Sequence, residues 1–120
     1  MKKKLSFIFT CKDDNYVENF INRMEFTVNF NLRIIEKIGK LDQIEFVIID
    51  WGSENEISQK FKIYDQKYKE KIKFYYFDPK ITKENSHGLP GDFYQELAHN
   101  CGIVRSEGSH IITGHADTIY

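Results

Sequence analysis

Residues Ile44 to Glu54 read I-E-F-V-I-I-D-W-G-S-E, and this stretch decides the fold class. A run of β-forming residues from Ile44 to Ile49 leads into a carboxylate at Asp50, and Gly52-Ser53 then ends the strand. The pattern predicts a buried strand that delivers Asp50 to a loop. Ligands of open α/β sheets bind beyond the carboxyl ends of the strands, so Asp50 is a candidate ligand contact.

Three further β-rich runs occur in the chain, and helical patterns separate them. The runs are Leu5–Thr10, Ile72–Phe77 and His110–Thr113; the helical patterns are Tyr16–Lys40, Glu56–Glu70 and Phe93–Arg105. One helix between successive strands implies right-handed crossovers and a parallel sheet with helices on both faces. We therefore expect an α/β fold: a Rossmann-like three-layer sandwich of four mainly parallel strands, forming one domain over residues 1–120.

Each helical pattern has an apolar stripe that should face the sheet. In the first helix, Gly39 is a plausible C-cap and Asn29–Asn31 a possible break. Residues 80–91 are expected to form a loop. The stripes are Val17, Phe20, Ile21, Met24, Val28, Leu32 and Ile35; then Ile57, Phe61, Tyr64 and Tyr68; then Phe93, Leu97, Cys101 and Val104.

Composition narrows the class of protein. The chain has 120 residues and a formal net charge of -1, so bulk electrostatics favour neither nucleic acid nor a membrane surface. No segment approaches the roughly 20 apolar residues of a membrane span. Cys11 and Cys101 belong to no C-x-x-C pair, which leaves reduced thiols as the simplest reading. We expect a cytoplasmic protein, with peripheral membrane attachment as an option for a longer form.

All four expected strands end in or near a carboxylate. The acids are Asp13 and Asp14, Asp50, Asp78, and Asp117. Because parallel strands share one carboxyl edge, these side chains should line one rim, and an oxygen-rich rim suits Mg²⁺ or Mn²⁺. A simpler reading exists for some of them: Asp13 and Asp14 suit a helix N-cap, and Asp78 before proline suits a turn.

Two residues near these acids have alternative readings. His115 is separated from Asp117 by Ala116 alone, so both can face one metal or ligand. Trp51 can stack on a ligand or close the core. The sequence lacks G-x-G-x-x-G and G-x-x-x-x-G-K-[ST], which disfavours a nicotinamide dehydrogenase and a phosphate-loop NTPase. A receiver-type phosphorylation domain, which also gathers acids around Mg²⁺, is the alternative.

Three blocks together resemble the N-terminal half of a glycosyltransferase of the GT-A fold, family 2 type. The segment Leu5–Asn15 is similar to that family's first strand and nucleotide loop, and Val47–Glu54 resembles its V-V-D-D-G-S motif. The segment Leu97–Tyr120 resembles A-x-N-x-G-x-x-x-A-x-G-x-x-I followed by a D-x-D metal motif. The matching positions in that last block are Ala98, Asn100, Gly102, Gly108, Ile111 and Asp117.

The resemblance implies a nucleotide-diphosphate sugar, typically a UDP-sugar, as ligand. Asp50 would accept a hydrogen bond from the base, and Asp117 with His115 would hold Mn²⁺ or Mg²⁺ at the diphosphate. His115 stands where the family has the first metal-motif Asp, and Trp51 where it has a second Asp. The nucleotide set implied by the resemblance is Thr10, Cys11, Asp14, Asp50, Trp51 and Asn100.

Family members of this kind are roughly twice as long, a size still typical of one domain. Their acceptor site and catalytic base lie in the second half. We therefore expect the donor-binding half of a hexosyltransferase-type enzyme, inactive in isolation, with an unknown glycan, lipid or protein acceptor. The alternative is a non-catalytic nucleotide-binding or receiver-like signalling module.

Overall fold

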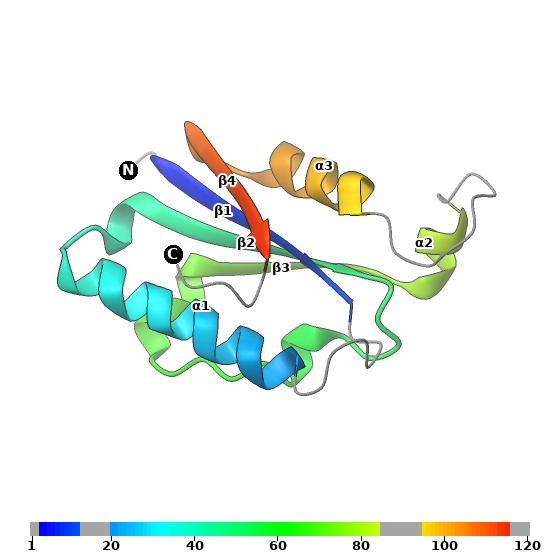
Figure 1. Ribbon diagram of the computed structural model, residues 1–120, viewed down its shortest axis with the longest axis horizontal. Helices are drawn as coiled ribbons and strands as arrows, with labels where there is room; N and C mark the ends of the chain where they lie inside the picture. The colour runs from blue at the N-terminus through cyan, green and yellow to red at the C-terminus, as the bar shows by residue number, and fades with distance from the viewer. Residues whose placement is uncertain (1–2, 13–19, 85–94, 116–120) are drawn as a thin grey trace.

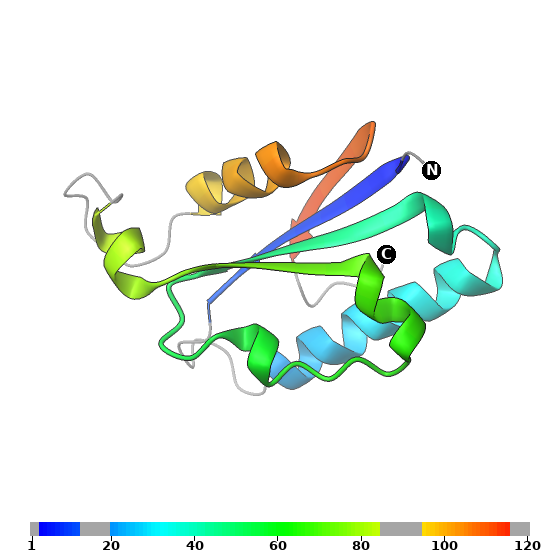
Figure 2. The same cartoon turned by 180° about the vertical axis from the view of Figure 1, so that it is seen from behind.

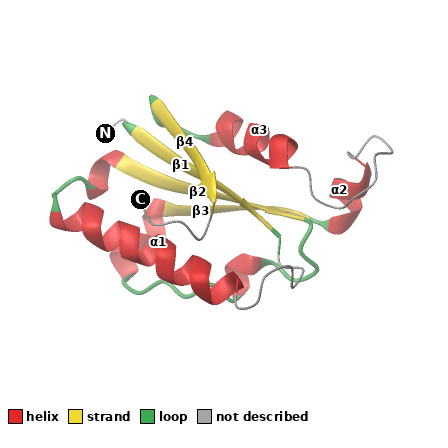
Figure 3. Cartoon of the chain, in the orientation of Figure 1, coloured by secondary structure: helices red, strands yellow, loops and turns green. Residues whose placement is uncertain are grey.

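A single parallel sheet forms the centre of the computed structural model, which describes residues 3–12, 20–84 and 95–115. Its strands are β1 (Leu5–Cys11), β2 (Ile44–Trp51), β3 (Ile72–Phe77) and β4 (His110–His115). They lie in the order β3-β2-β1-β4, and every pair is parallel (Figure 3). The predicted α/β fold with four parallel strands is confirmed.

Helices cover both faces of the sheet. The helix α1 (Phe20–Lys37) lies on one face and α3 (Gln95–Arg105) on the other (Figures 1 and 2). Alternate residues of β2 enter the two cores: Phe46 and Ile48 pack toward α1, whereas Val47 and Ile49 pack toward α3. All four are fully buried, which explains why β2 reads as a continuous apolar run rather than an alternating one.

The helix α1 is continuous through Asn29 and Asn31, so the possible break does not occur. It ends at Lys37, and Gly39 follows with a φ of 74°, in the left-handed region. The Lys40 N–H donates to the Ile35 carbonyl (3.1 Å) and the Gly39 N–H to the Glu36 carbonyl (3.0 Å). This pair of bonds is a Schellman cap, and it confirms Gly39 as the C-cap.

The prediction of a helix over Glu56–Glu70 is wrong. Two short 3₁₀ helices, η2 (Ile57–Gln59) and η3 (Gln66–Lys71), stand at the ends of that stretch, and residues 61–63 between them are irregular. Three residues of the predicted stripe are nevertheless buried, namely Ile57, Phe61 and Tyr68, whereas Tyr64 is exposed. The apolar spacing identified most of the buried residues but not the backbone conformation.

Side chains of α1 explain this result. Glu25 Oε1 accepts from the Lys62 N–H (3.0 Å), and Asn29 both donates to the Lys62 carbonyl (2.9 Å) and accepts from the Tyr64 N–H (2.9 Å). These bonds satisfy backbone groups that a helix would otherwise pair within itself. The segment can therefore follow α1 without being helical.

Replacing Asn29 with alanine should therefore loosen residues 62–64 specifically. Because the Tyr64 N–H and the Lys62 carbonyl would lose their partner in a part-buried setting, we expect the protein to lose about 1–3 kcal/mol of stability. Urea unfolding measures the loss, and amide exchange at Lys62 and Tyr64 localises it. The control is Asn22→Ala, an exposed asparagine of the same helix. Equal effects of both variants would contradict the assignment.

Two further differences concern the segments after β3 and the face of α3. The loop predicted over residues 80–91 is wrong at its start, because α2 (Pro79–Glu84) occupies that stretch. Asp78 caps this helix by accepting from the Ile81 N–H (2.9 Å). Proline suits the first helical position because its missing N–H would have no partner there.

Val104, expected in the buried stripe of α3, is 81% exposed, since that helix packs through Ala98 and Gly102 instead. A η1 turn (Leu41–Gln43) precedes β2.

Candidate functional site

The carboxyl ends of the strands meet at one edge of the sheet, as the parallel arrangement predicts. In register, Cys11 pairs with Asp50, and Asp50 with Tyr76. Thr10 lies between Ile49 on one side and His115 on the other. The expected neighbours Thr10, Cys11, Asp50 and His115 therefore come from adjacent strands at the same level.

The strand order places a topological switch point at this edge. The chain moves from β1 to β2 and β3 on one side, and β4 then returns to the other side of β1. This is the order of the first four strands of a Rossmann fold, in which ligands bind in the crevice where the direction of strand addition reverses. A receiver domain has the order 2-1-3-4-5, so the receiver alternative is wrong.

Asp50 is a buried carboxylate at this edge, only 1% exposed. Its Oδ2 accepts from the Ile57 N–H (2.9 Å), which anchors η2 beneath the strand. Ser53 lies close enough to lower the pKa of this carboxyl, but Oδ1 makes no hydrogen bond of good geometry to the described residues. Burial raises the pKa of Asp50, and the hydrogen bond from Ile57 and the proximity of Ser53 act against that rise.

The W-G-S turn after β2 is built into the sheet. Gly52 has a φ of 88°, and its N–H donates to the Phe77 carbonyl (2.8 Å). A Cβ at Gly52 would lie 2.9 Å from Thr82 Oγ1 of α2, so any other residue would have to shift the Thr82 side chain and adopt a left-handed backbone conformation. The Tyr76 hydroxyl donates to the Ser53 carbonyl (2.6 Å). The local fold therefore fixes the loop that follows Asp50.

The other predicted nucleotide contacts on β1 and β2 are interior side chains. Trp51 is 3% exposed and packs against Phe77, with ring centroids 5.2 Å apart, in the core under α3. Cys11 is buried on the α1 side and donates to the Ile49 carbonyl (3.5 Å). Thr10 is 9% exposed. Trp51 and Cys11 therefore pack in the two cores, and the contact of all three residues with a nucleotide stays a prediction.

The remaining predicted site residues are spread more widely. Asn100 is exposed on α3, and the backbone of His115 ends β4 beside Thr10. Asp14 and Asp117 lie outside the described residues, as does Asp13. Among residues 3–12, 20–84 and 95–115, no group of three or more His, Cys, Asp or Glu side chains is placed to hold a metal ion. The described donors alone therefore do not form a metal site.

Three small residues of the third sequence block have structural explanations. Ala98 is fully buried against the sheet. A Cβ at Gly102 would lie 2.5 Å from Ile8 Cγ2, and one at Gly108 would lie 2.5 Å from Ser6 Oγ. Close packing of α3 and of the loop after it onto the sheet requires these small residues. Their spacing therefore reports the approach of α3 to the sheet, whatever ligand the edge binds.

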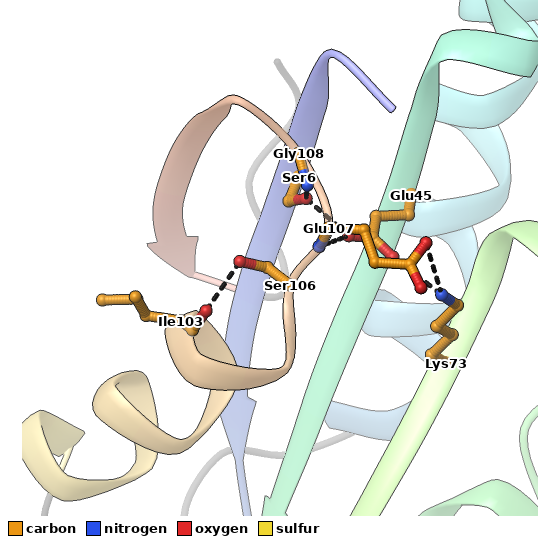
Figure 4. Close-up of polar contacts among 7 residues, drawn as sticks. All are labelled: Ser6, Glu45, Lys73, Ile103, Ser106, Glu107 and Gly108. Atoms are coloured by element: carbon orange, nitrogen blue, oxygen red, sulfur yellow. Dashed lines mark hydrogen bonds and ion pairs between the residues drawn. The ribbon is translucent and has the colours of Figure 1, made fainter. Parts of the chain in front are cut away.

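A buried polar network at the amino end of the sheet was missed by the sequence analysis. Glu45 of β2 is fully buried, and its Oε2 accepts from Ser6 Oγ (2.6 Å) and from the Glu107 N–H (2.6 Å) (Figure 4). Its Oε1 lies 3.0 Å from Lys73 Nζ. Ser6 Oγ accepts in turn from the Gly108 N–H (2.9 Å). The sequence feature that could have revealed this network is Glu45 itself, a glutamate inside the apolar run I-E-F-V-I-I.

The network keeps Glu45 ionised. Burial raises the pKa of this carboxyl, but hydrogen bonds from Ser6, the Glu107 N–H and Lys73 outweigh burial, so its pKa is lower than usual. The pKa of Lys73 is raised, mainly because its hydrogen bond and charge interaction with Glu45 outweigh burial. Both shifts favour the charged pair.

Comparisons with known proteins assign no family: the sequence matches no protein-family model, and no curated protein matches it significantly. In the described part of the chain, no helix has both the length and the apolar character needed to cross a membrane.

Proposed function

We propose that the chain binds a nucleoside-diphosphate sugar, such as a UDP-sugar, at the carboxyl edge of its sheet as the donor-binding unit of a glycosyltransferase. The observation that carries the proposal is the switch point at β1, where Thr10 lies between β2 and β4. The strands that belong to the glycosyltransferase-like blocks, β1, β2 and β4, have their carboxyl ends at this same edge. A site at a switch point is the usual ligand position in such sheets.

Asp50 has one oxygen suited to a ligand donor. Oδ2 is engaged by the Ile57 N–H, whereas Oδ1 has no well-formed hydrogen bond among the described residues. A buried acceptor without a partner costs about 1–3 kcal/mol, so a base N–H that reached Oδ1 would recover part of that cost. Uracil presents such an N–H. Reaching Asp50 requires the edge to open, because the side chain is almost fully covered.

The proposal assigns the diphosphate to the region of His115 and Asp117, where the resemblance implies a divalent cation. Such an ion would supply charge neutralisation at the diphosphate. The described residues hold no metal set by themselves, so Asp117 is required for this part of the proposal. Sugar transfer to an acceptor belongs to the same proposal, and binding alone would define a nucleotide-binding module.

Calorimetric titration of the chain with UDP, with and without Mn²⁺, tests this function. We expect Mn²⁺-dependent binding, weakened at least about tenfold by Asp117→Asn and by Asp50→Asn, since each removes a charge-assisted contact. ADP should bind more weakly than UDP, because adenine has no ring N–H in the place of the uracil N3–H that Asp50 would bind. The control is Asp42→Asn, an exposed aspartate before β2 at the opposite edge. No UDP binding at millimolar ligand would refute the proposal.

A further inference from the structure

We propose that the buried network around Ser6 and Glu45 sets the register in which β4 pairs with β1. The two N–H groups that join this network belong to Glu107 and Gly108, directly before β4. The network lies at the amino end of the sheet, next to the start of β4 (Figure 4), whereas His115 is the last residue of that strand. It therefore acts at one end of the strand and determines the position of residues at the other.

The apolar pattern of β4 does not specify its own register. Ile111 and Ile112 face opposite sides of the sheet, in line with Ser6 and Phe7. They are 41% and 36% exposed, nearly the same. A shift by one residue would exchange one half-exposed isoleucine for the other at little cost, and registers of this kind are prone to slippage. Another interaction must select the observed pairing.

The backbone bonds of β4 also lack this specificity. The His110 N–H donates to the Lys4 carbonyl (3.0 Å), and a strand shifted along β1 can form bonds of the same kind. The bonds to Glu45 and Ser6 differ because their acceptors are particular side chains, at 2.6 Å and 2.9 Å. A shifted strand would leave the Glu45 carboxylate and the Ser6 hydroxyl buried without these donors.

Steric fit restricts the same position. A Cβ on Gly108 would lie 2.5 Å from Ser6 Oγ and 2.7 Å from the Ser6 backbone nitrogen. A shift that brought any residue other than glycine to this place would meet the backbone of β1, which cannot yield as a flexible side chain does. Both the hydrogen bonds and the packing at Ser6 therefore select one register.

The consequence for the candidate site follows from the register. With β4 as observed, His115 lies beside Thr10. A shift by one residue would move His115 away from this level and turn its side chain to the opposite face of the sheet. A neighbouring residue of the Gly114-His115-Ala116-Asp117 sequence would take its place beside Thr10. Ser6 and Glu45 are thus positioning residues for the carboxyl edge, and this role in ligand binding rests on the proposed function.

The register can be read directly in the full chain, without ligand, by NMR. In the wild-type chain we expect cross-strand NOEs that match Phe7 with Ile112 and Ile8 with Thr113. Ser6→Ala removes one hydroxyl, which both donates to Glu45 and accepts from Gly108. We expect shifted or doubled β1–β4 NOEs and at least about tenfold faster amide exchange in β4, with β1–β2 NOEs unchanged.

The matched control is Ser109→Ala, which removes an exposed hydroxyl that donates to the Lys4 carbonyl (3.2 Å) in the same connection. It should retain the wild-type NOEs and exchange rates. Gly108→Ala keeps the bond between Ser6 and Glu45 but forces the loop away from Ser6, so it should also disturb the β1–β4 NOEs. This second variant tests the claim independently of Ser6.

The proposal is overturned if both Ser6→Ala and Gly108→Ala keep one wild-type set of β1–β4 NOEs. It is also overturned if β1–β2 pairing is lost to the same extent as β1–β4 pairing, since the network would then stabilise the sheet without selecting a register. A UDP titration of the wild-type chain separates the two proposals. If the two variants alter the NOEs but the wild-type chain binds no UDP, the nucleotide site is refuted and the register claim stands.

Discussion

Glu45→Ala should lower the free energy of unfolding by about 3 kcal/mol, the upper end of the usual cost of leaving buried hydrogen-bonding groups without a partner. The truncation leaves Lys73 without its closest anion, and it removes the acceptor for both Ser6 Oγ and the Glu107 N–H. It also opens a void beside β1, where Glu45 is fully buried. Urea unfolding followed by circular dichroism measures the change.

The matched control is Glu107→Gln. This side chain is 62% exposed and meets Lys73 at 3.5 Å, while its backbone N–H, the donor to Glu45, is retained. An exposed ion pair contributes at most about 1 kcal/mol, so we expect a small change. If Glu107→Gln costs as much as Glu45→Ala, the stabilisation does not come from the buried contacts.

The contribution of Glu45 should depend on pH in a defined direction. Its pKa in the folded protein is lowered, so the folded state binds this proton less readily than the unfolded state does. The stabilisation is fully present above the unfolded pKa of about 4.3, and it is lost as pH falls through the lower folded value. The difference between wild type and Glu45→Ala, measured from pH 7 downward, should therefore shrink below about pH 4.

Gly102→Val should destabilise the protein by about 3 kcal/mol, at the upper end of the usual cost of overpacking. A Cβ at this position would lie 2.5 Å from Ile8 Cγ2 and 3.3 Å from Ile49 Cγ1. Both isoleucines are fully buried, and their branched side chains have little rotamer freedom. The helix α3 would have to move off the sheet. Thermal unfolding of the variant measures the loss.

A smaller change at the same site gives a test of sign. In an exposed helix, Gly→Ala stabilises by about 1 kcal/mol. Gly102→Ala should instead destabilise, because the contact with Ile8 outweighs the helix propensity. In an Ile8→Ala background the obstacle is removed, so Gly102→Ala should become neutral or stabilising. Asn100→Ala, at an exposed position of the same helix, is the control for helix propensity alone. If Gly102→Ala still destabilises the protein in the Ile8→Ala background, the packing explanation is contradicted.

The strand pattern and the common edge could be predicted because both depend on local sequence. The apolar run before Asp50 is buried on both faces, and its length and termination are encoded within a few residues. The parallel direction of the strands follows from the alternating strand and helix patterns, and it brings Asp50, Cys11 and Thr10 to one edge. The sequence thus identified the edge of the sheet on which a ligand site would be sought.

The sequence could not reveal how the residues at this edge are buried. Asp50 and Trp51 are adjacent in the chain but face opposite sides of β2, one anchoring η2 and the other packing under α3. Nor could the sequence reveal the backbone conformation of Glu56–Glu70. There Asn29 and Glu25, far away in sequence, form hydrogen bonds with the backbone of residues 62–64. Such long-range bonds override local helical spacing.

The sequence by itself determined the α/β class, the strand positions and the edge at which Asp50 lies, because hydrophobic periodicity and turn residues act locally. Only the tertiary structure decided the order β3-β2-β1-β4, the small residues required under α3, and the partners of Glu45. The physical reason is distance along the chain: Ser6, Glu45 and Gly108 meet only after β1, β2 and β4 have paired, and no local pattern encodes that contact.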